Sequence, residues 1–188
     1  INRLIVANPI YFLSNENYAF VKGSIMGKDK LADIMKDIDI VFHYAAVVGV
    51  KKTLEEPLNV LNVNIEGTRN VFETALGAGV KKVVNISSSE VYGEPVQLPM
   101  KEDGVLNAKL PYAVAKLAGE LYGEAYFKEN GLKTCSLRFF NVYGPRQIST
   151  AYGFVVGIFI QQALSGKPLT VFGDGKQTRD FTFITDNL

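Results

Sequence analysis

Three side chains in this sequence have the types and spacing needed to remove a proton from an alcohol: Ser88, Tyr112 and Lys116. Tyr112 and Lys116 are four residues apart, so on a helix they share one face. A free tyrosine has a pKa near ~10 and is a weak base at neutral pH. A lysine cation at about 4 Å and an effective dielectric constant of ~20 would favour the phenolate by roughly 4 kcal/mol, or about 3 pKa units. We therefore expect Lys116 to lower the pKa of Tyr112, and the Ser88 hydroxyl to bind the same substrate oxygen.

A Tyr-x-x-x-Lys spacing is common by itself, and such a pair on a helix is often only a surface contact. The serine-rich segment 87–89 lies directly after an apolar run that reads as a strand. A hydroxyl-bearing strand end that precedes the helical pair favours the catalytic interpretation over the structural one.

The composition is that of one soluble domain or slightly more, with 188 residues of which 47% are apolar. The formal net charge is +1 without a run of Lys or Arg, so we expect neither nucleic-acid nor membrane-surface binding. The most apolar late stretch, 152–164, is too short to span a bilayer. The single cysteine, Cys135, lies in an apolar run and excludes an internal disulfide, which fits a cytoplasmic protein. We expect no metal site.

Short apolar runs alternate with longer helical patterns, which predicts an α/β fold with a parallel sheet and helices on both faces. Glycines mark the ends of two predicted helices, at 77–79 and at Gly131. The regular alternation ends near Gly144-Pro145-Arg146, which indicates a domain boundary. The predicted strands are 38–43, 80–87, 133–140 and 169–172, and the predicted helices are 58–76, 112–130 and 154–165.

Small or polar residues follow three of the predicted strands. In parallel α/β sheets, ligands bind outside the carboxyl ends of the strands, and small residues there let a ligand approach closely. Ala and Ser also fit tight strand-to-helix turns, so this pattern alone leaves both interpretations open. The three segments are 44–46, 87–89 and 139–141.

The sequence resembles the extended short-chain dehydrogenase/reductase family, in particular the NAD-dependent nucleotide-sugar epimerases and dehydratases. The resemblance covers almost the whole chain, with the motifs in the family's order. They are His43-Tyr44-Ala45-Ala46, Asn64-Ile65-Glu66-Gly67-Thr68, the segment 87–93, the Tyr112/Lys116 pair, Arg138 to Arg146 and Phe172 to Phe181.

The resemblance implies a doubly wound, Rossmann-like sheet in a partial NAD-binding domain at 1–145, and the beginning of a substrate-binding domain at 146–188. It implies that Tyr112 is the general base and acid, that Lys116 tunes it and holds the nicotinamide ribose, and that Ser88 bonds the C4 hydroxyl. Other implied cofactor residues are Ala45, Ala46, Val47, Asn64, Ser87 and Phe139. The implied residues for a UDP-sugar are Phe140, Asn141, Thr170, Phe172 and Arg179, the last of these at the diphosphate.

Two features depart from the family pattern. No G-x-x-G-x-x-G occurs, although the family uses that turn to seat the cofactor pyrophosphate, so we expect the turn and its strand to precede Ile1. Ser24 lies where relatives carry an aspartate for the adenine amine. We therefore expect the isolated 188-residue segment to be inactive, with little affinity for NAD.

The family includes several activities, and the resemblance is compatible with more than one of them. The leading hypothesis is NAD-dependent 4-epimerisation of a UDP-sugar through a transient 4-keto sugar. A UDP-glucuronate decarboxylase is the alternative, whereas a dehydratase is disfavoured because Ser89-Glu90 lacks the usual Asp-Glu pair. A non-catalytic relative would typically have lost Tyr112 or Lys116. Relatives commonly dimerise through the two long helices, which implies a homodimer.

Overall fold

The computed structural model describes residues 18–145, 147 and 154–187. The start of the chain and Arg146 therefore lie outside the described residues. In chain order the elements are α2 (Lys28–Ile34), β1 (Ile40–His43), α3 (Val50–Glu55), α4 (Pro57–Gly77), β2 (Lys82–Ser88), the 3₁₀ helix η1 (Ser89–Tyr92), α5 (Pro111–Asn130), β3 (Lys133–Phe139), β4 (Asn141–Tyr143), α6 (Val155–Leu164), β5 (Phe181–Phe183) and the 3₁₀ helix η2 (Ile184–Asn187).

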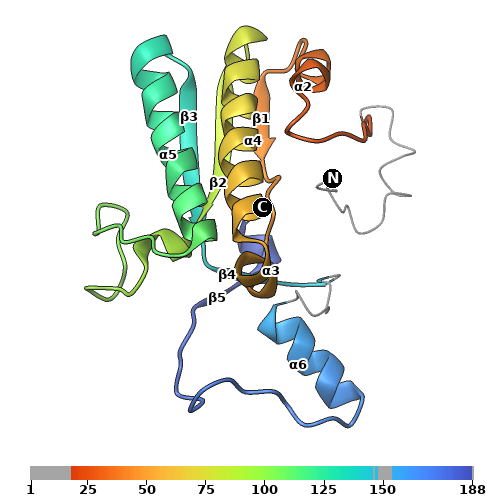
Figure 1. Cartoon of the computed structure of the whole chain (residues 1–188), viewed down its shortest axis with the longest axis vertical. Coiled ribbons are helices and arrows are strands. Elements are labelled where there is room, and N and C mark those ends of the chain that lie inside the picture. Colours follow the sequence, from red (N-terminus) through yellow and green to blue (C-terminus); the bar gives the residue numbers. More distant parts are fainter. Residues whose placement is uncertain (1–17, 146, 148–153, 188) are drawn as a thin grey trace.

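The central feature is a parallel sheet with the order β1-β2-β3 (Figure 1). Phe42 pairs with Val84, and Val84 pairs with Cys135, so the three strands run in register. At the carboxyl end of the sheet, Ser88 is opposite Phe139. This confirms the predicted α/β fold with a parallel sheet.

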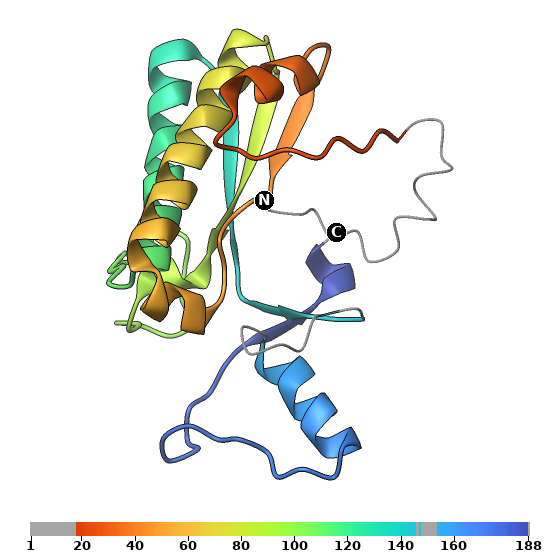
Figure 2. The ribbon, with the colours of Figure 1, turned by 45° about the vertical axis from the view of Figure 1, so that its right-hand side comes forward.

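The two long helices, α4 and α5, lie side by side on one face of this sheet (Figure 2). Both begin with a proline in the first turn, where the missing N–H has no intrahelical partner to lose. Helix α5 is terminated by Gly131, the residue after its end, which adopts the left-handed conformation (φ 72°) and donates its N–H to the Phe127 carbonyl. In the described part of the chain, Phe42 on the other face of the sheet remains 61% exposed.

The hydrophobic core lies between α4, α5, α2 and the sheet. Phe72 is fully buried and stacks on Tyr126 of α5 with ring centroids 5.6 Å apart. This packing holds α4 and α5 against the sheet and so fixes the residues that α5 presents to the end of β2. The buried members of the core are Ile25, Leu31, Met35, Val71, Phe72, Ala75, Val80, Val83 and Leu132.

A second, two-stranded parallel sheet joins β4 to β5, and α6 lies in the chain between them. Figures 1 and 2 show this part below the main sheet, on the side of its carboxyl ends. The predicted strand at 169–172 is wrong, because this segment is exposed and pairs with no strand in the part of the chain that the structure describes. Its Leu-Thr-Val-Phe composition favours a strand, but a strand needs a hydrogen-bonded neighbour.

Candidate active site

Ser88, Tyr112 and Lys116 come together at the carboxyl end of β2. Ser88 is the last residue of β2, and its hydroxyl interacts with the Tyr112 phenol at the start of α5, which lowers the pKa of that phenol. Lys116 lies one turn further along α5, with its Nζ 5.7 Å from the centroid of the Tyr112 ring. Lys116 Nζ also donates to the Ile86 carbonyl oxygen at 2.5 Å, which ties the helix to the strand. The predicted catalytic residues are therefore neighbours in space.

The pKa of Tyr112 differs from our expectation. Burial, with the Glu90 carboxylate as the second cause, raises the pKa of Tyr112 to about 12, and the hydrogen bond from Ser88 offsets only part of this. Burial lowers the pKa of Lys116 to about 8. The prediction that Lys116 brings the phenol near neutrality is therefore wrong for this structure. The reason is that both groups are buried, and the Lys116 ammonium donates to the Ile86 carbonyl.

The end of β1 forms the second part of the site. Ala45 and Ala46 are half-buried there, and Val47 is buried. Asn64 of α4 holds Val47 through both ends of its amide, accepting from the Val47 N–H at 2.6 Å and donating to the Val47 carbonyl at 2.9 Å. Asn64 thus fixes the backbone of this turn.

His43 is a buried polar group between the sheet and the helices. Its Nε2 lies 2.9 Å from Thr68 Oγ1, and it is only 3% exposed. Burial, assisted by the positive charge of Lys116, lowers the pKa of His43 to about 3. His43 is therefore neutral at physiological pH.

The low pKa of His43 predicts a loss of stability in acid. Because the folded pKa is below the unfolded value of about 6.5, the unfolded state binds the proton first, so stability falls as pH decreases below about 6.5. We expect unfolding in urea to show about 2 kcal/mol less stability at pH 5 than at pH 7 from this group. His43→Gln should lose less stability between the two pH values. An equal loss in both proteins would contradict the assignment.

A cluster of charged and polar side chains beside the site escaped the sequence analysis. Glu120 of α5 is 6% exposed and accepts from the Ser87 hydroxyl. It also forms an ion pair with Arg138 of β3, with Arg138 Nη2 2.8 Å from Glu120 Oε2. The spacing Tyr112, Lys116, Glu120 places all three on one face of α5, which is the signal in the sequence that could have indicated Glu120.

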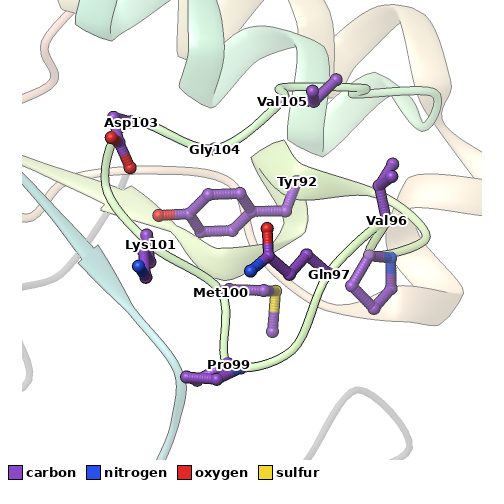
Figure 3. A pocket seen from close by; sticks show the side chains of 10 residues that line it. Tyr92, Val96, Gln97, Pro99, Met100, Lys101, Asp103, Gly104 and Val105 are labelled. Atoms are coloured by element: carbon purple, nitrogen blue, oxygen red, sulfur yellow. The ribbon is translucent and has the colours of Figure 1, made fainter.

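The loop between η1 and α5 encloses a cavity of about 340 Å³. Figure 3 shows the Tyr92 ring projecting into the loop, close to Met100 and Gln97. The loop starts at Gly93, whose φ of 61° and close approach to the Asn107 carbonyl exclude a side chain. Ser88 and Tyr112 do not line this cavity, so it is separate from the candidate active site.

Three further residues that were predicted to bind the cofactor or the substrate lie at the end of β3 and directly after it. Phe139 lies near Tyr44, with ring centroids 6.2 Å apart, across the ends of β3 and β1. Asn141 binds the Asp180 carbonyl through both its backbone N–H and its side-chain Nδ2. Phe140 is half-buried and borders a hollow beside Arg138.

Three predicted substrate residues lie on the exposed segment after α6. Thr170 is bound by Gln162 of α6, with Gln162 Nε2 2.8 Å from Thr170 Oγ1. Phe172 is 79% exposed, and the Arg179 guanidinium donates to the adjacent Thr178 carbonyl. The structure does not gather these three residues around Ser88.

Two features are absent from the part of the chain that the structure describes. Among these residues, no group of three or more His, Cys, Asp or Glu side chains is arranged to hold a metal ion. No described helix combines the length and apolarity needed to cross a bilayer.

Ser24, at the position where relatives were expected to carry an aspartate, is exposed, and its hydroxyl accepts from the Met26 N–H.

Comparison with known proteins agrees with the geometry. The model of the NAD dependent epimerase/dehydratase family matches residues 4–187. A UDP-N-acetyl-alpha-D-glucosaminuronate decarboxylase of Bacillus cytotoxicus is 39% identical over 176 residues, which cover 90% of this chain and 54% of the relative. A UDP-glucose 4-epimerase of Mycolicibacterium smegmatis is 38% identical over 176 residues, covering 92% of this chain and 56% of the relative.

The solved structures show the same fold. The UDP-glucuronic acid 4-epimerase from Bacillus cereus, in complex with UDP-glucuronic acid and NAD, superposes with a TM-score of 0.86 at 36% identity. The match covers 94% of this chain and 55% of that one. The chain thus spans a little over half the length of the relatives it matches. These findings confirm the resemblance drawn from the motifs: the chain belongs to the NAD-dependent epimerase/dehydratase family.

Proposed function

We propose that this chain carries the catalytic residues of a UDP-sugar 4-epimerase that uses NAD. The observation that carries the proposal is the contact of Ser88 with Tyr112, one helical turn from Lys116, in a chain of this family. A hydroxyl, a phenol and an ammonium at one strand end can together bind a sugar hydroxyl and exchange its proton.

The end of β1 and the start of α5 fit the nicotinamide half of the cofactor. The half-buried Ala45 and Ala46 leave room for close approach, the Val47 turn is held rigid by Asn64, and Lys116 supplies a donor for ribose hydroxyls. Ser87 and Phe139 would lie at its edge, at the ends of β2 and β3. When bound, NAD⁺ would supply the hydride acceptor and donor for C4 of the sugar and a positive charge close to these residues.

Tyr112 exchanges the proton of the C4 hydroxyl in this proposal. With a pKa raised to about 12, the phenol is the form present at neutral pH, so the phenolate needs added positive charge beside it. Lys116, with a pKa of about 8, is still largely protonated at pH 7 and is the nearby cation that this chain supplies. The Ser88 hydroxyl holds the substrate oxygen against the phenol throughout the exchange.

The rest of the substrate would be held by residues after β3. We propose that Phe140 and Asn141 face the sugar nucleotide, Thr170 and Phe172 border its base, and Arg179 pairs with its diphosphate. Phe172 and Arg179 are exposed and available for such contacts. Because they lie on the segment after α6, this proposal makes that segment part of the substrate site.

Decarboxylation of a UDP-hexuronate is the second candidate. It is supported by the 39% identity to the decarboxylase of Bacillus cytotoxicus. It begins with the same oxidation at C4, so the catalytic residues do not separate the two. The negative charge of Glu90, close enough to raise the pKa of Tyr112, opposes a sugar carboxylate at this place and favours a neutral sugar.

We also propose a homodimer through the outer faces of α4 and α5. Leu121 and Phe127 on α5 are 56% and 59% exposed, which leaves apolar surface for a second copy. The single cysteine, Cys135, supports a cytoplasmic location. Sedimentation equilibrium would show a dimer if the α4 and α5 faces pair as proposed, and a monomer if they do not.

The proposed activity is tested with the complete gene product. It is incubated separately with UDP-glucose, UDP-N-acetylglucosamine and UDP-glucuronate, without added NAD, and the anomeric protons are followed by NMR. A C4 epimer is the expected product and identifies the substrate. A UDP-pentose from UDP-glucuronate would establish the decarboxylase instead. No product from any of them, with NAD supplied as well, would contradict the proposal.

A further inference from the structure

Helix α5 is attached to the end of β2 at three successive turns. Tyr112 contacts Ser88, Lys116 donates to the Ile86 carbonyl, and Glu120 accepts from the Ser87 hydroxyl. Three consecutive residues of the strand are thus each bound by a residue of one helix face. The first two helix residues belong to the proposed chemistry, whereas Glu120 has no role in it.

Arg138 extends this attachment to β3 and to the loop. Its Nε lies 3.0 and 3.2 Å from the two carboxylate oxygens of Glu120, and its Nη2 lies 2.8 Å from Oε2. Its Nη1 donates to the Tyr92 hydroxyl at 2.9 Å and to the Glu102 carbonyl at 2.8 Å. The guanidinium carbon also stacks on the Tyr92 ring, 4.9 Å from its centroid. The planar guanidinium group of Arg138 therefore binds α5, η1 and the loop that leads into α5.

Ser88 lies between two residues that this pair holds. Ser87, the residue before it, is bound to Glu120, and Tyr92, four residues after it, is bound to Arg138. Ser88 itself is extended (φ −152°, ψ 149°) and accepts from the Glu90 N–H, at the junction of β2 and η1. A shift of either neighbour would therefore move the Ser88 hydroxyl relative to Tyr112.

Stability alone is a weak explanation for this ion pair. The side chains of Arg138 and Glu120 are 17% and 7% exposed, so both charges lose most of their hydration. The attraction between buried charges often only balances that loss, and apolar replacements of similar volume are frequently neutral. The distinctive property of the pair is its geometry, since its donors and acceptors join α5 and β3 to β2, η1 and the loop around Ser88.

We propose that Glu120 and Arg138 are positioning residues that set the contact between the Ser88 hydroxyl and the Tyr112 phenol. The proposal rests on the proposed function, in which these two groups share the C4 oxygen of the sugar. Neither positioning residue touches the substrate. Misplacement of a reacting group by about 1 Å can lower a rate by about 10²-fold, which sets the expected size of the effect.

The test uses three variants of the complete protein. Arg138→Lys keeps the charge but cannot bind Glu120, Tyr92 and the Glu102 carbonyl together. Glu120→Gln keeps the side-chain length but loses the charge. Tyr92→Phe keeps the ring and removes only its hydroxyl, so it is the variant that disturbs folding least. Glu73→Gln is the control, because it breaks an ion pair of α4 with Lys28 (2.7 Å) away from the site.

Two readouts separate positioning from stability. The first is steady-state kinetics, where we expect Arg138→Lys and Glu120→Gln to lower kcat by about 10- to 10²-fold with KM changed less than about threefold. The second is the ionisation of Tyr112, followed by ¹⁹F NMR in protein containing 3-fluorotyrosine and assigned with Tyr112→Phe. Its midpoint should move to higher pH, since the Ser88 hydrogen bond that lowers this pKa is weakened.

The outcomes decide the proposal in each case. Folded variants with a lower melting temperature but wild-type kcat and an unchanged Tyr112 midpoint would overturn it. If Arg138→Lys and Glu120→Gln do not fold, Tyr92→Phe decides by the same two readouts, with a smaller expected change. If the wild type turns over no UDP-sugar, the proposed function fails, and the Tyr112 midpoint alone still tests the positioning role. Glu73→Gln should match the wild type throughout.

Discussion

Replacing Tyr112 by phenylalanine is expected to lower kcat of the complete enzyme by about 10²- to 10⁴-fold, near the full contribution of general acid–base catalysis. The substitution removes one oxygen from a half-buried ring at the start of α5 and leaves the ring packing unchanged. KM should change little, because the Ser88 hydroxyl still binds the substrate oxygen. Steady-state kinetics on the UDP-sugar that the wild type converts provides the measurement.

Tyr122 offers a matched control for this substitution. It lies on the same helix, half-buried, and away from the Ser88 end of the strand. Tyr122→Phe should keep wild-type kcat. If Tyr112→Phe retained more than about a tenth of the wild-type kcat, another group would have to carry the proton, and the assignment of Tyr112 would be wrong.

Replacing Lys116 by methionine should lower kcat by about 10²-fold or more without loss of stability at pH 7. The chemical effect arises because the site loses the Lys116 ammonium, which lies 5.7 Å from the centroid of the Tyr112 ring. The stability effect has the opposite sign. With a folded pKa of about 8 against an unfolded value near ~10.4, the buried ammonium costs about 3 kcal/mol below pH 8, and this cost disappears as pH rises towards 10.4.

Unfolding in denaturant at pH 7 and pH 9.5 checks the sign of this effect of Lys116 on stability. The wild type should gain stability between these pH values from this group, whereas Lys116→Met should gain less, and at pH 7 the variant should be at least as stable as the wild type. Lys128→Met, at the exposed last turn of α5, is the control. A variant that is strongly destabilised at pH 7 but fully active would show that Lys116 is a structural residue.

The main elements of the fold could be predicted because their local signals agree. The α4 and α5 patterns combine helical periodicity, a proline in the first turn and glycines at the end, and the observed bounds differ from the predicted ones by one residue at most sites. Strand β3 was predicted at 133–140 and observed at Lys133–Phe139. Differences of this size are within the ambiguity of element ends.

The failures concern elements whose existence depends on partners. The segment 169–172 has strand-forming residues but no neighbouring strand, whereas β5 is only three residues long and exists because it pairs with β4. Helix α3 has six residues, too few for a clear periodic pattern. Such elements are decided by tertiary contacts, which a linear pattern does not contain.

In the candidate site too, some features could be predicted from the sequence and others could not. The motifs predicted that Ser88, Tyr112 and Lys116 would meet, and the structure places them together. The pKa of Tyr112 could not be predicted, because burial opposes ionisation by an amount that spacing does not reveal. Arg138 was part of a recognised motif, but its role was missed since its partners Glu120 and Tyr92 are 18 and 46 residues away in the sequence.

The proposed 4-epimerase mechanism is tested most directly by following the hydrogen at C4 of the sugar. The complete protein is given UDP-glucose, or whichever UDP-sugar it converts, with deuterium at C4, and the product is analysed by NMR and mass spectrometry. The proposed 4-epimerase should give a C4 epimer that keeps its deuterium at C4, because the hydride leaves and returns within one site while Tyr112 exchanges only the hydroxyl proton. A C4 epimer with hydrogen from solvent at C4, or a product that keeps the original C4 configuration, would contradict it.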